Sequence, residues 1–197
     1  MTSTLDTVLD RARSVGFLGP GPIRAHIEHA ERYLTALPQD ARRMIDLGSG
    51  GGIPGLAILT HRPDLSAVLL DAATKRGAFL TWAVVELGMA DRVQVAVGRA
   101  ELLAHDPSYR QQFDVMVSRG FGPPAITLEN ARGYVRPGGL AIISEPPGGR
   151  SWPAGALSQL AFEELDAPDD VAVFRALGDA PGDIPRPHKR QQRSPLF

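Results

Sequence analysis

The sequence has no cysteine among its 197 residues. That absence excludes disulfide bonds, thiolate metal sites and catalysis by a cysteine nucleophile. The chain also lacks any apolar run close to the ~20 residues that a membrane-spanning helix needs. Its N-terminus lacks the basic and apolar pattern of a secretory signal. We therefore expect a cytoplasmic protein that has no membrane partner.

The chain has almost no net charge, because 21 basic residues face 22 acidic ones. It is not a polycation, so any contact with a nucleic acid must come from a local group of basic residues. No spacing of acids and histidines suggests a metal site, and we expect none. Hydrophobic residues make up 43% of the chain, which is enough to predict one globular α/β domain with its own core.

Glycine is concentrated in one stretch, DLGSGGGIPGL at residues 46–56. Apolar residues lead into Asp46, and an apolar, helix-like run follows Pro54. This pattern predicts a strand, a tight turn and the start of a helix. The free N–H groups of that helix start face whatever the loop holds.

Two cofactors fit such a loop. Gly50 to Gly55 matches the dinucleotide pattern G-x-G-x-x-G, and the run from Asp46 matches the methyltransferase pattern acidic-x-G-x-G-x-G. Asp46 favours the second, since a carboxylate repels a pyrophosphate but suits the positively charged amino-acid end of S-adenosylmethionine. An apolar strand at 65–71 closes on Asp71, which can accept hydrogen bonds from ribose hydroxyls in either cofactor class.

Apolar strands alternate with helical segments from residue 43 onward, which predicts a mostly parallel sheet covered on both faces. Two helices are expected before the first strand, and two strands joined by a turn are expected after the fifth. The expected strands are 43–47, 66–71, 92–97, 113–118, 139–144, 159–166 and 171–177, and the expected helices are 5–15, 23–37, 54–61, 75–87 and one from Pro124. We divide the chain into a helical segment (1–40), a cofactor-binding domain (41–178) and a basic, proline-rich tail (179–197).

Several segments in this order resemble the glucose-inhibited division protein B family of bacterial small-subunit ribosomal RNA methyltransferases. The glycine loop looks like that family's cofactor loop, and the segment from Gly98 to Glu101 resembles its "GRAE" motif. Phe113-Asp114 with Ser118-Arg119 resembles its "FD…SRA" segment, and residues 184–196 resemble its basic C-terminus. The resemblance implies a seven-stranded class I methyltransferase fold, Rossmann-like, with a C-terminal antiparallel hairpin.

The resemblance further implies S-adenosylmethionine as cofactor and guanine N7 in ribosomal RNA as target. Gly48 and Ile53 would line the cofactor loop, and Asp71 would meet the ribose. Arg119 would lie near the methionine end and the reacting atoms, as the catalytic candidate. The full expected cofactor set is Asp46, Gly48, Ser49, Gly50, Ile53, Asp71, Arg99, Ala100, Glu101, Ser118 and Arg119.

The tail carries four basic residues and no acid from Ile184 to Phe197. These residues either bind RNA phosphates or belong to a solvated end of the chain. The expected partner is ribosomal RNA or the small ribosomal subunit, and the chain is expected to be a monomer. Because the expected cofactor residues lie between Asp46 and Arg119, we expect removal of the tail to leave cofactor affinity unchanged. The candidate RNA contacts are Arg186, Lys189, Arg190 and Arg193.

Two segments depart from the family pattern. The family usually carries a lysine after the fifth strand, where this chain has Glu145, and Gly-Phe-Gly follows Arg119 in place of Ala-Phe-Ala. The departures keep two alternatives open. One is a small-molecule methyltransferase on the same scaffold, and the other is a non-catalytic RNA- or ribosome-binding relative. A dinucleotide oxidoreductase is a more distant alternative.

Overall fold

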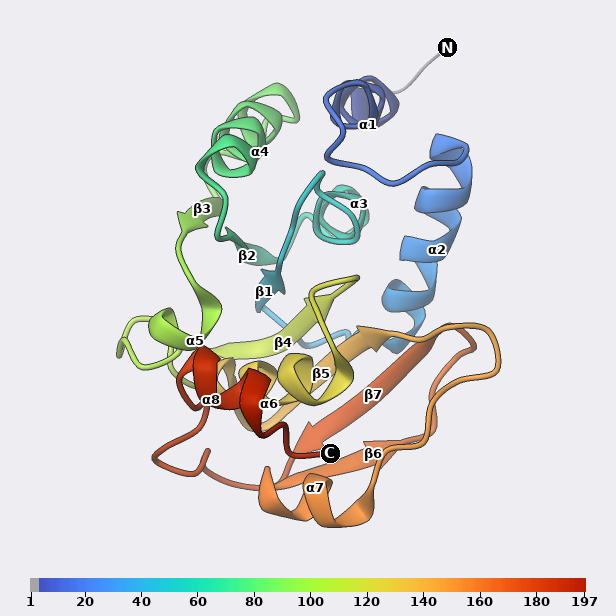
Figure 1. Cartoon of the computed structure of the whole chain (residues 1–197). Coiled ribbons are helices and arrows are strands. Elements are labelled where there is room, and N and C mark those ends of the chain that lie inside the picture. Colours follow the sequence, from blue (N-terminus) through green and yellow to red (C-terminus); the bar gives the residue numbers. More distant parts are fainter. Residues whose placement is uncertain (1–3) are drawn as a thin grey trace.

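The structure is a computed structural model that describes residues 4–197. Seven strands form one sheet in the order β3-β2-β1-β4-β5-β7-β6 (Figure 1). The first five run parallel, and β7 pairs antiparallel with both β5 and β6. The strands are β1 (Arg43–Leu47), β2 (Ser66–Asp71), β3 (Val93–Val97), β4 (Phe113–Ser118), β5 (Val135–Ser144), β6 (Phe162–Leu165) and β7 (Val171–Ala176). The predicted class I methyltransferase fold is confirmed.

Helices cover both faces of the sheet, with α1 to α4 on one side and α5 to α8 on the other (Figure 1). The helices are α1 (Thr4–Ser14), α2 (Ile23–Ala36), α3 (Gly55–His61), α4 (Thr74–Glu86), α5 (Ala100–Leu103), α6 (Pro124–Tyr134), α7 (Ala154–Gln159) and α8 (His188–Arg193). The chain therefore has three layers, with the sheet between two layers of helices.

Strand residues divide between two hydrophobic cores because successive side chains point to opposite faces. Met44 belongs to the core under α1 to α4, and its neighbour Ile45 belongs to the core under α5 to α8. Val115 and Met116 divide in the same way. All four are fully buried, so these strands are apolar on both faces, as parallel strands usually are.

The predicted strands of the parallel part are found within a residue or so, except that β5 begins earlier, at Val135. The prediction was wrong for the start of the strand pair, because the residues up to Gln159 form α7 and β6 begins at Phe162. The short helices α5 and α7 were not predicted. Helices of four and six residues carry too few turns for a clear period of apolar residues.

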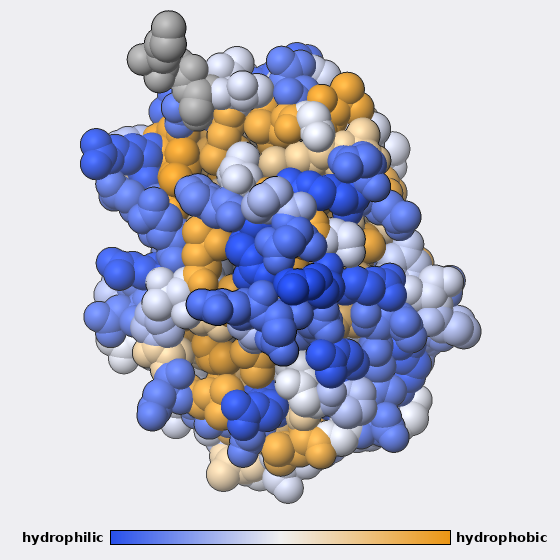
Figure 2. All heavy atoms as spheres, turned by 180° about the vertical axis from the view of Figure 1, so that it is seen from behind, coloured by the Kyte–Doolittle hydropathy of each residue, from blue (hydrophilic) through white to orange (hydrophobic). Residues whose placement is uncertain are grey.

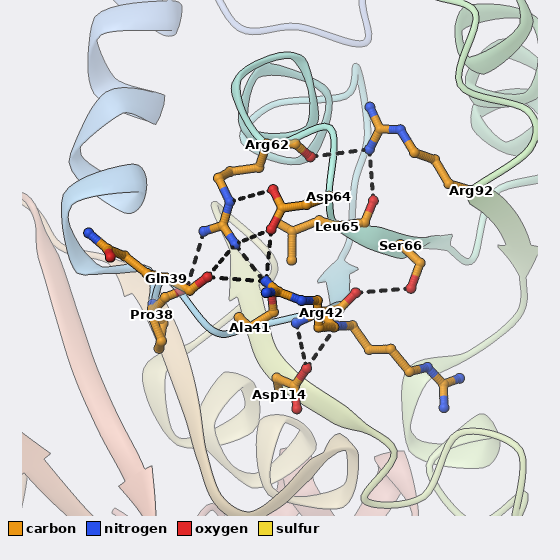
Figure 3. Close-up of polar contacts among 11 residues, drawn as sticks. Pro38, Gln39, Ala41, Arg42, Arg62, Asp64, Leu65, Ser66, Arg92 and Asp114 are labelled. Atoms are coloured by element: carbon orange, nitrogen blue, oxygen red, sulfur yellow. Dashed lines mark hydrogen bonds and ion pairs between the residues drawn. The ribbon is translucent and has the colours of Figure 1, made fainter.

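A polar network holds the edge where β1 begins (Figure 3). Asp114 Oδ2 accepts from the backbone N–H groups of Arg42 and Arg43 at 2.7 and 2.8 Å, which ties β4 to the start of β1. The Arg62 guanidinium makes two hydrogen bonds of 2.8 Å to Asp64 and also donates to three backbone carbonyls. Side chains that bond to backbone groups thus hold the amino ends of β1 and β4 in place, and these contacts stabilise the fold.

The face of the molecule opposite to that of Figure 1 has a mixed surface. Hydrophilic residues cross its middle, and hydrophobic residues show between them (Figure 2). Among residues 4–197, no helix is both long enough and apolar enough to cross a membrane.

Candidate functional site

The carboxyl ends of β1 and β4 lie side by side at the point where the strand order reverses. Leu47 pairs with Ser118 in the ladder between the two strands. Open parallel sheets bind ligands in the crevice at such a point. Asp46 and Arg119 therefore come to one edge of the sheet, and Asp71 joins them from the end of β2.

Glycine sets the shape of the loop between β1 and α3. Gly48 and Gly50 have φ values of +72° and +55°, which residues with a Cβ rarely adopt. A Cβ on Gly48 would also lie 2.9 Å from Phe121 Cδ2. The N–H groups of Gly48 and Ser49 both donate to the Leu70 carbonyl, at 2.8 and 3.0 Å. The loop is thus held against β2, and position 48 can take no side chain.

Asp46 is completely buried beneath this loop. Its Oδ2 accepts from the Gly55 N–H at 3.1 Å, and its Oδ1 has no partner among residues 4–197. Burial raises the pKa of Asp46 to about 7, against the opposing effect of that N–H donor. A nearby cationic group would stabilise a buried carboxylate that has a free oxygen. The buried carboxylate thus lies beneath the loop as a negative charge, and the glycine turn above it fits a close backbone approach by the amino-acid end of S-adenosylmethionine.

Asp46 makes the free energy of unfolding depend on pH. The ordinary pKa of its carboxyl is 3.8, and the folded value is about 7. Between these values the folded state binds the extra proton, so stability falls as pH rises from about 4 to about 7, by up to about 1.4 kcal/mol per pH unit. Denaturant unfolding of wild type and Asp46→Asn across this range measures the effect. The variant should lack this fall, and an equal fall in both proteins would contradict the assignment.

Asp71 joins the glycine loop to the end of β2. Its side chain is buried, and its two oxygens accept from the N–H groups of Gly50 at 3.0 Å and Ala73 at 2.8 Å. Arg76 lies 3.6 Å from Oδ2. Each oxygen keeps a second lone pair, so the predicted contact with a ribose hydroxyl remains open to it.

The segment after β3 is fixed by two polar contacts. Arg99 pairs with the buried carboxylate of Glu101, and the Tyr134 hydroxyl donates to the Ala100 carbonyl at 2.6 Å. The predicted residues Arg99, Ala100 and Glu101 line a pocket of about 620 Å³. Its other lining residues are Ala72, Phe121, Gly122, Pro123, Ile126, Asn130, His188, Gln191, Gln192 and Pro195.

Phe121 connects this pocket to the glycine loop. It lines the pocket, and its ring lies against Gly48. The predicted residues of the loop do not line the pocket themselves. Two of them, and Ser118 at the end of β4, have packing roles. Ser49 Oγ donates to the Asp46 carbonyl, Ser118 Oγ donates to the Leu47 carbonyl, and Ile53 is buried in the core under α1 to α4.

Arg119 follows β4 and projects toward α2. One of its terminal nitrogens lies 3.1 Å from His26 Nδ1, and no carboxylate of residues 4–197 is within ion-pair distance of it. Burial, followed by the charge of Arg119, lowers the pKa of both His26 and His29. Neutral His26 can therefore accept a hydrogen bond from the guanidinium. The Tyr33 hydroxyl also donates to the Ser118 carbonyl at 2.8 Å, which holds this strand end against α2.

The basic tail contains α8 and packs onto α6. Arg186, expected to contact RNA, is 7% exposed, and its guanidinium makes bonds of 2.9 and 2.7 Å to the two oxygens of buried Glu129. It is therefore not free to bind a phosphate. The other three candidates, Lys189, Arg190 and Arg193, are exposed on α8.

A second pocket, of about 980 Å³, lies beside the end of β5. The Glu145 side chain is 6% exposed there, its Oε1 pairs with Arg150 at 3.1 Å, and its Oε2 has no partner among residues 4–197. Burial raises the pKa of this carboxyl. Five acidic residues line the pocket against two arginines: Glu145, Glu164, Asp166, Asp169 and Asp170, with Arg32 and Arg150.

Sequence reasoning missed several residues that line these pockets or support the site. His26, Asn130 and Gln191 belong to no motif of the sequence. All three meet their partners through contacts between segments far apart in the chain, so no local spacing could have found them. In the part of the chain that the structure describes, no group of histidines and acids could hold a metal ion.

Comparison with solved structures supports the fold. The cofactor-bound protein Rv0187 from MTB aligns with a TM-score of 0.65 and 18% identity, over 89% of this chain and 90% of that one. A methyltransferase from Geobacter sulfurreducens aligns with a TM-score of 0.64 and 16% identity, over 89% and 88%. At these identities the likeness shows the fold alone.

Comparison with known sequences identifies the family. A protein named ribosomal RNA small subunit methyltransferase G from Moorella thermoacetica is 41% identical over 55% of this chain, which spans only 45% of that protein. Proteins of the same name from Clostridium novyi (31% identity) and Neisseria meningitidis (40% identity) match over 80% and 79% of this chain and over 70% and 69% of their own length. The family model described as rRNA small subunit methyltransferase G matches residues 23–144. The chain belongs to this family, the GidB family.

Proposed function

We propose that this chain transfers a methyl group from S-adenosylmethionine to N7 of a guanine in small-subunit ribosomal RNA. The main support is that the family match at residues 23–144 contains every predicted cofactor residue. In the sheet, the carboxyl ends of the parallel strands, which these residues follow, lie on one side. We further propose that the chain acts as a monomer in the cytoplasm, with the small ribosomal subunit or its RNA as partner.

The proposed reaction needs no general base from the protein. The cofactor supplies an electrophilic methyl group, and guanine N7 carries a free lone pair at neutral pH. The protein must hold the two in line and exclude water. The glycine loop, with the buried carboxylate of Asp46 beneath it, would hold the ammonium end, Asp71 the ribose, and the segment at Ala100 and Glu101 the adenine. Arg119 would position the reacting groups at the strand end, held in place by His26.

Methyl transfer to RNA tests the proposal. Purified protein is mixed with methyl-labelled cofactor and small ribosomal subunits from a strain that lacks the gene, and the RNA is digested to nucleosides. Label in 7-methylguanosine supports the function. Label in another nucleoside, or none in RNA beside a folded protein that binds S-adenosylhomocysteine, would contradict it.

The acidic pocket beside β5 favours a second candidate, a methyltransferase that acts on a small cationic molecule. The free Oε2 of Glu145 and the four further acids would repel RNA phosphates and attract a cation. The same assay separates the two candidates. Label that stays in the small-molecule fraction of a cell extract and never enters RNA would favour the second.

The exposed charges of α8 give a prediction for RNA binding. If Lys189, Arg190 and Arg193 contact phosphates, each neutralising substitution should reduce the slope of log affinity against log salt by about 0.7 to 0.9. Filter binding of Lys189→Gln at several salt concentrations measures this slope. The matched control is Arg43→Gln, because Arg43 is an exposed arginine at the amino end of β1, away from the candidate site. This variant should leave the slope unchanged. Equal slopes for wild type and the α8 variants would show that the helix does not touch RNA.

A further inference from the structure

The segment between α1 and α2 (residues 15–22) packs directly on the glycine loop. A Cβ on Gly51 would lie 2.7 Å from the Phe17 carbonyl oxygen, so the two backbones are in close contact. The Phe17 N–H donates to the Ala12 carbonyl at 2.8 Å, which ties the segment to the end of α1. The segment is therefore held between α1 and the loop that we place at the cofactor.

His26 joins this segment to the end of β4. The residue is 6% exposed, its Nε2 lies 3.2 Å from the Gly19 carbonyl oxygen, and its Nδ1 lies 3.1 Å from a terminal nitrogen of Arg119. A carbonyl can only accept a hydrogen bond, and a guanidinium can only donate one. The two partners therefore fix one tautomer of the neutral ring, with the proton on Nε2 and the lone pair on Nδ1.

Three groups that carry or can gain positive charge face His26, namely Arg13 of α1, His29 of α2 and Arg119. Burial, then the charges of Arg119 and Arg13, lower the pKa of His26. Protonation of the ring would remove the acceptor at Nδ1 and place a second positive charge beside the guanidinium. The contact with Arg119 therefore belongs to the neutral ring.

Helix α2 holds Arg119 through its backbone neighbour as well as through its side chain. The Tyr33 hydroxyl donates to the Ser118 carbonyl, and His26 accepts from the guanidinium. Among residues 4–197, the Arg119 side chain makes no other hydrogen bond or ion pair. A guanidinium has several N–H donors, so those that His26 does not use stay available at this end of the strand.

We propose that His26 is a positioning residue for methyl transfer, which orients the Arg119 guanidinium by accepting a hydrogen bond at Nδ1 while the Gly19 carbonyl fixes the tautomer. The inference rests on the proposed function, since it takes Arg119 to act at the reacting groups. It makes the segment between α1 and α2 a part of the site, because this segment contacts the glycine loop and also sets the ring that holds Arg119.

Two variants separate the roles of the two ring nitrogens. His26→Asn keeps an acceptor oxygen near the place of Nδ1 and loses the donor to Gly19. His26→Gln reaches the place of Nε2 and loses the acceptor for Arg119. In single-turnover methylation of small ribosomal subunits with saturating cofactor, His26→Gln should be about tenfold slower than the wild type and His26→Asn within about threefold of it. A ring that only held the segment to α2 would give the opposite order.

The pH dependence of the same rate gives a second readout. As pH falls through the lowered pKa of His26, the wild type should slow by up to about tenfold per pH unit relative to His26→Asn, which has no titrating ring. Titration of Asp46 is common to both proteins, so the ratio of their rates removes it. The matched control is His29→Asn, on the same helix, which should keep the fall seen in the wild type. The melting temperature of each variant should stay close to that of the wild type.

Nuclear magnetic resonance of the ring nitrogens tests the contact without any methyl transfer. The wild type should show the Nε2–H tautomer of His26, and Arg119→Ala should raise the pKa of His26 because it removes a neighbouring positive charge. The Nδ1–H tautomer, a faster His26→Gln than His26→Asn, or equal falls with pH in wild type and His26→Asn would overturn the inference. A wild type that shows the expected ring signals but transfers no methyl group to RNA would instead overturn the proposed function.

Discussion

Arg186→Ala should destabilise the protein by about 3 to 5 kcal/mol, because it leaves the Glu129 carboxylate buried without its partner. The Glu129 side chain is 1% exposed, and it accepts two bonds from the guanidinium and a third from the Arg186 backbone N–H at 2.7 Å. Removal of one member of a buried pair costs far more than replacement of both by apolar residues. The double variant Arg186→Met with Glu129→Met should therefore lose less stability than Arg186→Ala.

Two measurements follow this effect. Denaturant unfolding gives the free energy of unfolding of each variant, and limited trypsin digestion reports release of the tail through cleavage at Lys189 and Arg190. Arg193→Gln is the control, because Arg193 is exposed on the same helix. If Arg186→Ala kept the wild-type stability within about 1 kcal/mol and an uncut tail, the pair would not anchor the tail.

Arg119→Ala should lower turnover by about a hundredfold to a thousandfold and leave the free energy of unfolding nearly unchanged. In other enzymes a shift of about 1 Å in the reacting groups costs about a hundredfold, and loss of one preorganised donor costs about a hundredfold to a thousandfold. Little stability depends on Arg119, because its guanidinium bonds to His26 and, among residues 4–197, forms no ion pair. Single-turnover methylation with saturating cofactor measures the chemical step, and thermal unfolding measures the fold.

Two variants sharpen this test. Arg119→Lys keeps the charge but not the fork of donors, so it should recover only part of the activity. His26→Gln removes the ring nitrogen that Arg119 contacts and should lower turnover less than loss of the guanidinium itself. A parallel loss of folding and activity in Arg119→Ala would show that the residue supports the fold instead.

Much of the sheet could be predicted because its signals are local. An apolar strand that ends on Asp46 and continues into a glycine loop needs only about a dozen neighbouring residues to be recognised. The same holds for the strand that closes on Asp71. The alternation of strands and helices then predicted a mostly parallel sheet, and the structure confirms that fold.

The tail could not be predicted in this way. Arg186 reads as one of four basic residues in a proline-rich end, and only the folded chain shows that it lies buried against Glu129. The contact of Arg119 with His26 likewise joins residues 93 positions apart. Residues such as Gln191 acquire their surroundings from packing between distant segments, which no local pattern carries.

The most direct test of the proposed function is mass analysis of nucleosides from the small-subunit ribosomal RNA of a strain without the gene. The proposal predicts that one 7-methylguanosine is lost, that the wild-type gene restores it, and that the Arg119→Ala gene does not. Unchanged 7-methylguanosine in the deletion strain would contradict the proposal.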